Sequence, residues 1–124
     1  MRKELLIFCC LIVLSGCMNE QSLIGVYTAN YKFGIDTLHL YKDHTFKQNF
    51  TANSRQSYSN EGTWKFTSGN RIQLYDYISY IQPIAGKFEK TSIWDSECRK
   101  SFSGEVSIVI NDDLDYYYIK QSGK

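Results

Sequence analysis

Apolar and polar residues alternate with a period of two through most of the chain after residue 22. The clearest example is residues 61–67, where Gly62, Trp64 and Phe66 share one face and charged or hydroxyl side chains occupy the other. Because successive side chains of a strand point to opposite sides of a sheet, the pattern predicts β-strands that are buried on one face. This part of the chain lacks the apolar stripe of an amphipathic helix.

The alternation predicts about eight strands. One is expected around Ile72 and Leu74, and residues 76–83, with their single proline, are interpreted as its end followed by a loop. Polar connections are expected over residues 52–60 and 96–103. The other strands are expected at residues 23–31, 35–41, 45–51, 61–67, 86–94, 105–110 and 114–120.

Tight turns are expected between several of these strands. Residues 42–45 predict a hairpin turn in which His44 adopts the left-handed conformation that histidine tolerates. Residues 68–70 and 111–113, which are rich in Ser, Gly, Asn and Asp, predict two more.

Consecutive hairpins with no helix to cover the sheet favour a closed antiparallel architecture, because closure hides the strand edges. We therefore expect an all-β domain over residues 23–124, with about eight antiparallel strands in a small up-and-down barrel or a closed sandwich. The large side chains expected to fill its interior are Phe46, Phe50, Trp64, Phe66, Phe88 and Trp94.

Three short motifs in this region resemble those of small lipocalin-like lipoproteins. They are Gly25-Val26-Tyr27, Asp43-His44-Thr45-Phe46 and Gly62-Thr63-Trp64. The resemblance implies a lipocalin-like barrel and a broad binding role. Tyr27 stands where the opening lipocalin motif usually has tryptophan, and the resemblance assigns no individual ligand-binding residue.

The first residues of the chain are typical of an export signal. A basic start, Met1-Arg2-Lys3, is followed after Glu4 by ten apolar residues from Leu5 to Leu14. A permanent membrane-spanning helix needs about 20 such residues. The segment Leu14-Ser15-Gly16-Cys17 then resembles the lipobox of bacterial lipoproteins.

That resemblance implies cleavage of residues 1–16 as a signal peptide and attachment of lipid, including palmitate, at Cys17. Residues 17–22 would then be the lipidated N-terminus and a short polar tether. The alternative is an ordinary secretory signal with a chance cysteine. Met18, rather than aspartate, implies the outer membrane facing the periplasm in a Gram-negative organism, or the outer face of the only membrane in a Gram-positive one.

The charge balance and the cysteine count limit the classes of partner and the disulfides that we expect for this chain. The whole chain carries 14 basic and 13 acidic residues, and loss of Arg2, Lys3 and Glu4 leaves 12 of each. This neutral balance argues against a nucleic-acid partner. Besides Cys17, the mature chain has only Cys98, which excludes an internal disulfide, and we expect this thiol to be buried or inert.

The candidate catalytic and metal-binding groups do not form a known pattern. His39 is expected on the solvent face of its strand and His44 in a turn, and no G-x-S-x-G motif is present. His39, Asp43 and His44 lack the spacing of a zinc site, and residues 111–115 lack the glycine and glutamate of an EF-hand. We therefore expect neither an enzyme nor a cofactor or metal.

Ten tyrosines leave an aromatic binding surface open as a possibility. Tyr116 and Tyr118 are expected to share one strand face, with Tyr117 on the other. Tyrosine is also a good strand residue, and we favour packing in the barrel as the role of these rings.

Two functions fit the sequence. The first is a lipid-anchored, noncatalytic envelope protein whose small barrel binds an apolar or cell-wall-derived ligand. The second is a protein-interaction module, such as an envelope inhibitor, immunity or stress lipoprotein, with a filled barrel.

Overall fold

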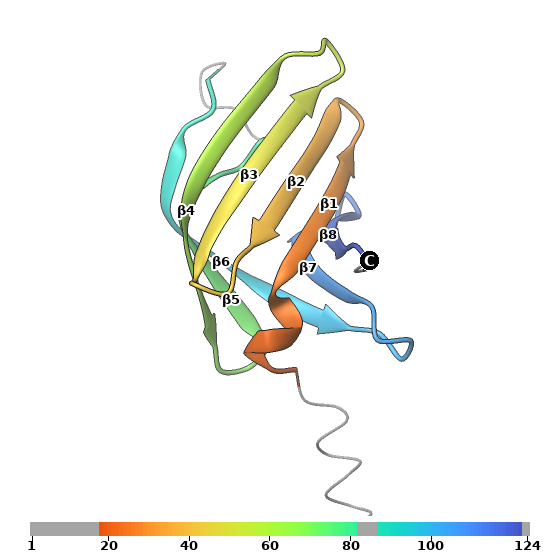
Figure 1. Ribbon diagram of the computed structural model, residues 1–124. Helices are drawn as coiled ribbons and strands as arrows, with labels where there is room; N and C mark the ends of the chain where they lie inside the picture. Colours follow the sequence, from red (N-terminus) through yellow and green to blue (C-terminus); the bar gives the residue numbers. More distant parts are fainter. Residues whose placement is uncertain (1–17, 82–86, 123–124) are drawn as a thin grey trace, which may run out of the picture.

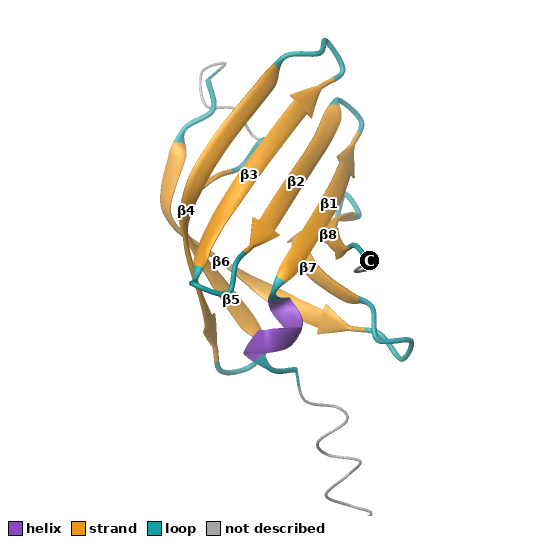
Figure 2. Ribbon diagram, viewed as in Figure 1, coloured by secondary structure: helices purple, strands orange, loops and turns teal. Residues whose placement is uncertain are grey.

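The computed structural model, which describes residues 18–81 and 87–122, is a closed eight-stranded antiparallel barrel (Figures 1 and 2). Each strand pairs with the next along the chain, and β8 returns to pair with β1. The all-β, up-and-down architecture expected from the alternation is therefore confirmed. The elements are η1 (Glu20–Leu23), β1 (Gly25–Tyr31), β2 (Gly34–Leu40), β3 (Thr45–Ala52), β4 (Ser57–Thr67), β5 (Arg71–Ile78), β6 (Lys90–Lys100), β7 (Val106–Asn111) and β8 (Tyr116–Lys120).

The two ends of the barrel differ in construction. The end that we call lower carries the 3-10 helix η1 and the turns β2–β3, β4–β5 and β6–β7, at the bottom of Figure 1. The upper end carries the turns β1–β2, β3–β4 and β7–β8 and the connection from β5 to β6. The first described residue, Met18, is buried beside Leu23, so the chain joins the barrel at its lower end.

The barrel is filled by the side chains that the alternation directs inward. Phe46, Phe50 and Trp64 are almost fully buried, while Phe66, Phe88 and Trp94 are partly buried against them. All six were expected in the interior. Trp64 also donates a hydrogen bond from Nε1 to the carbonyl oxygen of Tyr41 at 3.0 Å, so its polar atom is satisfied.

One glycine allows a close approach of two strands. A Cβ atom on Gly62 of β4 would lie 2.1 Å from the carbonyl oxygen of Tyr75 and 2.5 Å from the ring of Phe46. No side chain fits there. The glycine therefore lets β5 and the Phe46 ring pack directly on the backbone of β4.

The structure corrects the expected tether. Residues 19–22 do not form a free polar segment, because η1 begins at Glu20 and is capped by Asn19, whose Oδ1 accepts a 3.0 Å hydrogen bond from the Ser22 N–H. Burial of Met18 and Leu23 at either end holds this short helix against the barrel. Little chain remains between position 17 and the folded domain.

Four strand boundaries also differ from expectation. β4 begins at Ser57, inside the expected connection 52–60. β6 begins at Lys90 rather than at residue 86, and it extends to Lys100, through much of the expected connection 96–103. Both segments are polar in composition, yet they keep the alternation, with Asn60, Ser96 and Cys98 buried. β8 begins at Tyr116 because residues 112–115 form a four-residue turn.

Two expectations about turns have different outcomes. His44 has a φ of 69°, which confirms the left-handed turn expected there. Residues 82–86, which include Pro83 and the expected start of a strand at Gly86, lie outside the described residues.

Candidate functional site

One carboxyl group and three tyrosines form a buried cluster inside the barrel. Asp36, on the inward face of β2, is fully buried, with 0% of its surface exposed. Its Oδ2 accepts hydrogen bonds from the hydroxyls of Tyr118 and of Tyr31, the latter at 3.2 Å. The Tyr118 hydroxyl lies 2.8 Å from that of Tyr77. Within the described chain, the Oδ1 atom of Asp36 has no hydrogen-bond partner.

The environment of Asp36 favours its neutral form. Burial raises the pKa of Asp36 to about 7, against the opposing effect of the hydrogen bonds from Tyr118 and Tyr31. Burial also raises the pKa values of Tyr31, Tyr77 and Tyr118, so these hydroxyls remain protonated donors. The cluster supplies polar specificity within a mainly apolar interior.

Aromatic rings close the upper end of the barrel. Phe50 stacks on Tyr80 with ring centroids 4.6 Å apart, and Phe88 meets Tyr80 edge-on at 4.9 Å. Tyr31 meets Tyr116 edge-on at 4.8 Å on the other side of this layer. Offset and edge-on packing are the favoured arrangements of aromatic rings. The remaining rings of the layer are Phe33 and Tyr58.

Near this aromatic layer, β4 and β5 separate, and we call the resulting opening in the barrel wall the division. The two strands pair only from Thr63 to Thr67 on β4 and from Arg71 to Tyr75 on β5. At Asp76, with a φ of 63°, β5 turns away. The division holds a groove of about 610 Å³, which we call the rim groove; its lining residues are Ser57, Tyr58, Ser59, Ile78, Tyr80, Lys87 and Phe88.

Two amide side chains bridge the base of this division. Gln48 donates from Nε2 to the Ile78 carbonyl oxygen at 2.9 Å and accepts from the Ile78 N–H at 3.2 Å. Asn60 donates from Nδ2 to Gln48 Oε1 and to the Asp76 carbonyl oxygen, both at 2.8 Å. These bonds replace backbone pairing between β4 and β5, so the upper part of β5 stays attached although it has left the ladder.

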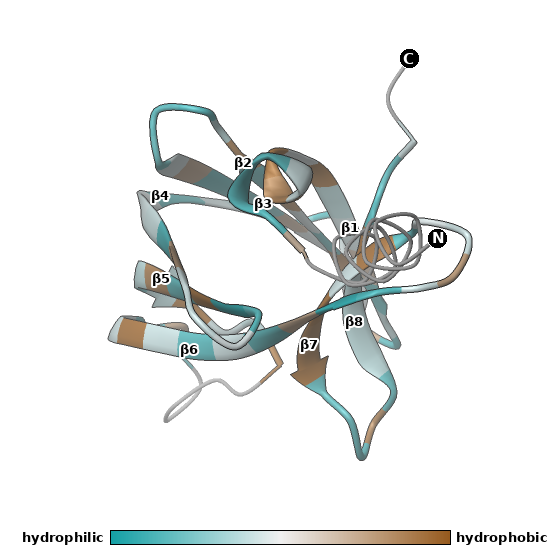
Figure 3. Ribbon diagram, turned by 90° about the horizontal axis from the view of Figure 1, so that it is seen from below, coloured by the Kyte–Doolittle hydropathy of each residue, from teal (hydrophilic) through white to brown (hydrophobic). Residues whose placement is uncertain are grey.

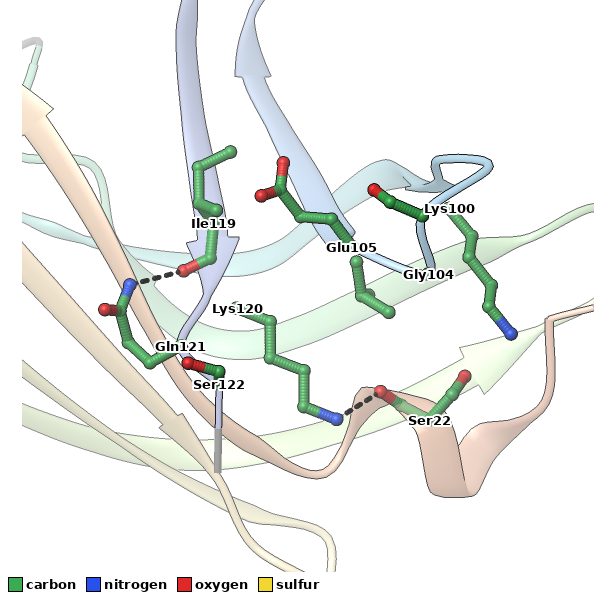
Figure 4. Close-up of a pocket in the computed structure, with 10 residues that line it drawn as sticks. Ser22, Lys100, Gly104, Glu105, Ile119, Lys120, Gln121 and Ser122 are labelled. Carbon is green, nitrogen blue, oxygen red and sulfur yellow. Dashed lines mark hydrogen bonds between the residues drawn. The ribbon is translucent and has the colours of Figure 1, made fainter. Parts of the chain in front are cut away.

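A second hollow lies at the lower end, between η1, the β6–β7 turn and the C-terminal part of β8 (Figure 4). It has a volume of about 650 Å³. Lys120 crosses it and donates from Nζ to the Ser22 carbonyl oxygen at 2.7 Å, which ties β8 to η1. Lys100 and Glu105 also line it, so with Lys120 the lining holds two basic side chains and one acidic side chain. We call this hollow the lower cleft.

The residues weighed from the sequence as catalytic or metal-binding candidates lie apart and serve local roles. His39 is half-exposed on the outer face and stacks on Tyr41, with centroids 3.9 Å apart. His44 Nε2 lies 2.8 Å from Glu20 Oε1. Arg99 bonds Asp112 through both terminal nitrogens, at 3.2 and 3.0 Å. Over residues 18–81 and 87–122, no three His, Cys, Asp or Glu side chains gather as metal ligands would.

Other expectations about single residues are confirmed. Cys98 is 2% exposed, and burial raises its thiol pKa to about 12, which makes it unreactive. Tyr118 is fully buried and Tyr116 half-buried on the same face. Tyr117 points outward, with its hydroxyl donating to Asp112. Cys17 and the leader 1–16 lie outside the described residues.

Sequence reasoning missed the polar residues that organise the interior. Asp36 shares its strand face with Leu38 and Leu40, and Gln48 lies midway between Phe46 and Phe50 on another inward face. The two-residue alternation of each strand therefore indicates that both side chains point inward. Their partners Tyr118 and Ile78 are distant along the chain, and no local pattern points to them.

No family model, no curated protein and no solved structure matches this chain. Among the helices of the described residues, none has the length and apolar character needed to cross a membrane.

Proposed function

We propose that this protein is a noncatalytic binding protein of the cell envelope, lipid-anchored at Cys17, that takes a cell-wall-derived ligand in the rim groove. The observation that carries the proposal is the groove itself. The half-buried rings of Tyr58 and Phe88 form an aromatic wall there, packed over the buried Tyr80 and beside the hydroxyls of Ser57 and Ser59.

The filled interior favours the rim over the centre of the barrel as the binding position. Below the rim, Phe50 stacks on Tyr80, and the Tyr77 hydroxyl bonds that of Tyr118, which donates to Asp36. An apolar ligand inside the barrel would have to displace these packed rings. A ligand in the rim groove meets an opening that exists already because β5 leaves β4.

The chemistry of the groove fits a sugar that carries a carboxylate. Aromatic rings offer faces on which the C–H side of a sugar packs. Ser57 and Ser59 offer hydroxyls to sugar oxygens, and the exposed Lys87 offers an ammonium to an anion. Muramyl peptides of the bacterial cell wall combine these features.

The proposal is tested by titrating the mature chain, residues 17–124, with a muramyl peptide while recording amide NMR shifts. We expect shifts at Ser57, Ser59 and Ile78, and several-fold weaker binding in Lys87→Ala. Lys65→Ala, which removes another exposed lysine, on β4 and outside the groove, is the matched control. Shifts spread evenly over the surface, or equal loss in both variants, would contradict the proposal.

A second candidate function has its own observation. Among the described residues, β6 pairs with β7 only from Cys98 to Lys100, whereas it pairs with β5 from Lys90 to Glu97. The upper part of β6 thus has one free edge, and Ile93 beside it is 53% exposed. A protein partner could add a strand at this edge.

The second function makes this domain a protein-interaction module with a filled barrel. A photo-crosslinking residue at Ile93 would then join the protein to one envelope partner in living cells. The same residue at Leu114, an exposed apolar position in the β7–β8 turn, serves as the control. Crosslinking at neither position, or equally at both, would reject the edge.

A further inference from the structure

The lower end of the barrel combines an exposed aromatic residue with the point where the chain enters the fold. Phe102, in the β6–β7 turn, is the most exposed large apolar side chain of the described residues, at 114% of its reference area. Met18, which follows the proposed lipid attachment site directly, is 7% exposed at the same end. Figure 1 shows η1 and the β6–β7 turn at the same end of the barrel, and Figure 3, seen from that end, shows the turn projecting to one side.

The β6–β7 turn is built to hold Phe102 away from the core. The Ser101 N–H donates to the Glu105 carbonyl oxygen at 2.9 Å, and the Gly104 N–H donates to the Ser101 carbonyl oxygen at 2.9 Å. Gly104 takes a φ of 89°, and the Ser101 and Ser103 hydroxyls lie 2.9 Å apart. The turn is therefore ordered by its own hydrogen bonds, without any burial of the Phe102 ring.

The short connection to Cys17 fixes which end of the barrel meets the membrane. Because Met18 is buried and η1 is capped and packed, no flexible spacer separates residue 17 from the fold. Lys120 adds to this by bonding the Ser22 carbonyl oxygen (Figure 4). Lipid on Cys17 would thus bring the lower end to the bilayer surface.

We propose that the lower end of the barrel is a membrane-facing surface, in which Phe102 enters the headgroup region of a phospholipid bilayer. This inference rests on the proposed lipid anchor. Aromatic side chains favour the interface between lipid and water. Lys100, beside the same turn and lining the lower cleft, presents an ammonium to lipid phosphates. The rim groove at the other end then faces away from the membrane.

The test couples the mature chain, residues 17–124, to vesicles through the Cys17 thiol. Phosphatidylcholine vesicles with a small fraction of maleimide lipid provide the anchor, and the buried Cys98 thiol does not compete. This chemical attachment replaces natural lipidation, so the orientation is measured even if natural lipidation does not occur.

Two tryptophan variants report on the two ends. Phe102→Trp places a fluorophore in the lower turn, and Leu114→Trp places one in the upper β7–β8 turn, where the native side chain is also exposed. With brominated acyl chains in the vesicles, we expect the emission added by F102W to fall by about half or more and that added by L114W to be unchanged. The coupled wild type corrects for Trp64 and Trp94.

Equal quenching of both variants, quenching of neither, or stronger quenching of L114W would overturn the proposal. Both positions are exposed, so loss of folding is not expected to confuse the result. Circular dichroism of each coupled variant provides the check.

Discussion

At the scale of single residues, the stability of the interior depends most on the protonation state of Asp36. It is the only Asp, Glu, Lys or Arg side chain that is buried among the described residues, and tyrosines supply its hydrogen bonds. The alternation of β2 directs Asp36 inward, because Asp36 shares a strand face with Leu38 and Leu40. Its hydrogen-bond partner Tyr118, however, lies 82 positions further along the chain. Such a pairing depends on closure of the barrel and cannot be predicted from local sequence.

The raised pKa of Asp36 predicts a stability that falls as pH rises. Between about pH 4 and pH 7 the folded state holds a proton that the unfolded state has lost, so the free energy of unfolding decreases over this window and levels off above it. Asp36→Asn, which keeps an oxygen acceptor for Tyr31 and Tyr118, removes this dependence. The stability of D36N relative to wild type is expected to rise by an amount on the order of 4 kcal/mol from pH 4 to pH 8.

Urea unfolding of both proteins at several pH values measures this difference. The other carboxyl groups are common to the two proteins, and their contributions cancel. A difference that stays constant across the window, or that shrinks as pH rises, would show that Asp36 is ionised in the folded state throughout.

Trp64 was expected in the core, and its position allows a quantitative prediction. The side chain is 2% exposed and is hydrogen-bonded to the Tyr41 carbonyl oxygen. Trp64→Ala should lower the free energy of unfolding by about 3–5 kcal/mol, because it leaves a large cavity and removes the hydrogen bond to Tyr41. Trp94→Ala, at a half-buried position, should have a smaller effect in the same denaturant titration. A near-neutral Trp64→Ala would contradict its assignment to the inner face.

At the scale of the elements, the sequence predicted where strands lie better than where they end. Apolar alternation located the strands around Leu38, Trp64 and Ile108 because their inward residues are hydrophobic. It failed at the start of β4 and the end of β6, where the inward residues include Asn60 and Ser96. The rim groove arises from that same exception, since Asn60 replaces a strand ladder with side-chain bonds.

The amide bridge predicts a local change in stability when it is removed. Gln48→Met keeps the size of the side chain but leaves the Ile78 N–H and carbonyl oxygen unpaired. We expect a loss of about 1–3 kcal/mol in the free energy of unfolding. Hydrogen exchange should also become faster at Ile78 than at amides of β1–β3.

Gln73→Met is the matched control for the bridge, because Gln73 bonds side chains on the outer surface of the barrel, Tyr75 of β5 and Asp95 of β6. Its exchange profile should resemble that of the wild type. Equal acceleration in both variants, or protection of Ile78 that survives Gln48→Met, would show that the upper part of β5 is held in another way.

At the scale of the whole molecule, the sequence predicts that the sheet closes into a barrel, but it does not predict where neighbouring strands separate. Eight short alternating strands joined by turns have few ways to hide their edges other than a barrel, and pairing of Tyr27 with Lys120 completes it. The separation of β5 from β4 depends on a left-handed residue at Asp76 and on the side-chain bridge from Asn60, and β6 pairs with β7 only from Cys98 to Lys100. These features decide where a ligand or partner has access, so the site was less predictable than the fold.

The proposed lipid anchor gives the prediction with the widest consequence. Two or three acyl chains, each contributing roughly 0.8 kcal/mol per buried methylene, hold a protein on a membrane far more firmly than one exposed phenylalanine. Cys17→Ser should therefore abolish labelling by radioactive palmitate and move the protein from the membrane to the soluble fraction. Cys98→Ala, which changes the only other cysteine of the mature chain, should alter neither. If Cys17→Ser loses the label but stays in the membrane fraction, a second anchor holds the protein, and the orientation argued from Met18 and Phe102 would then have to be assigned to that anchor.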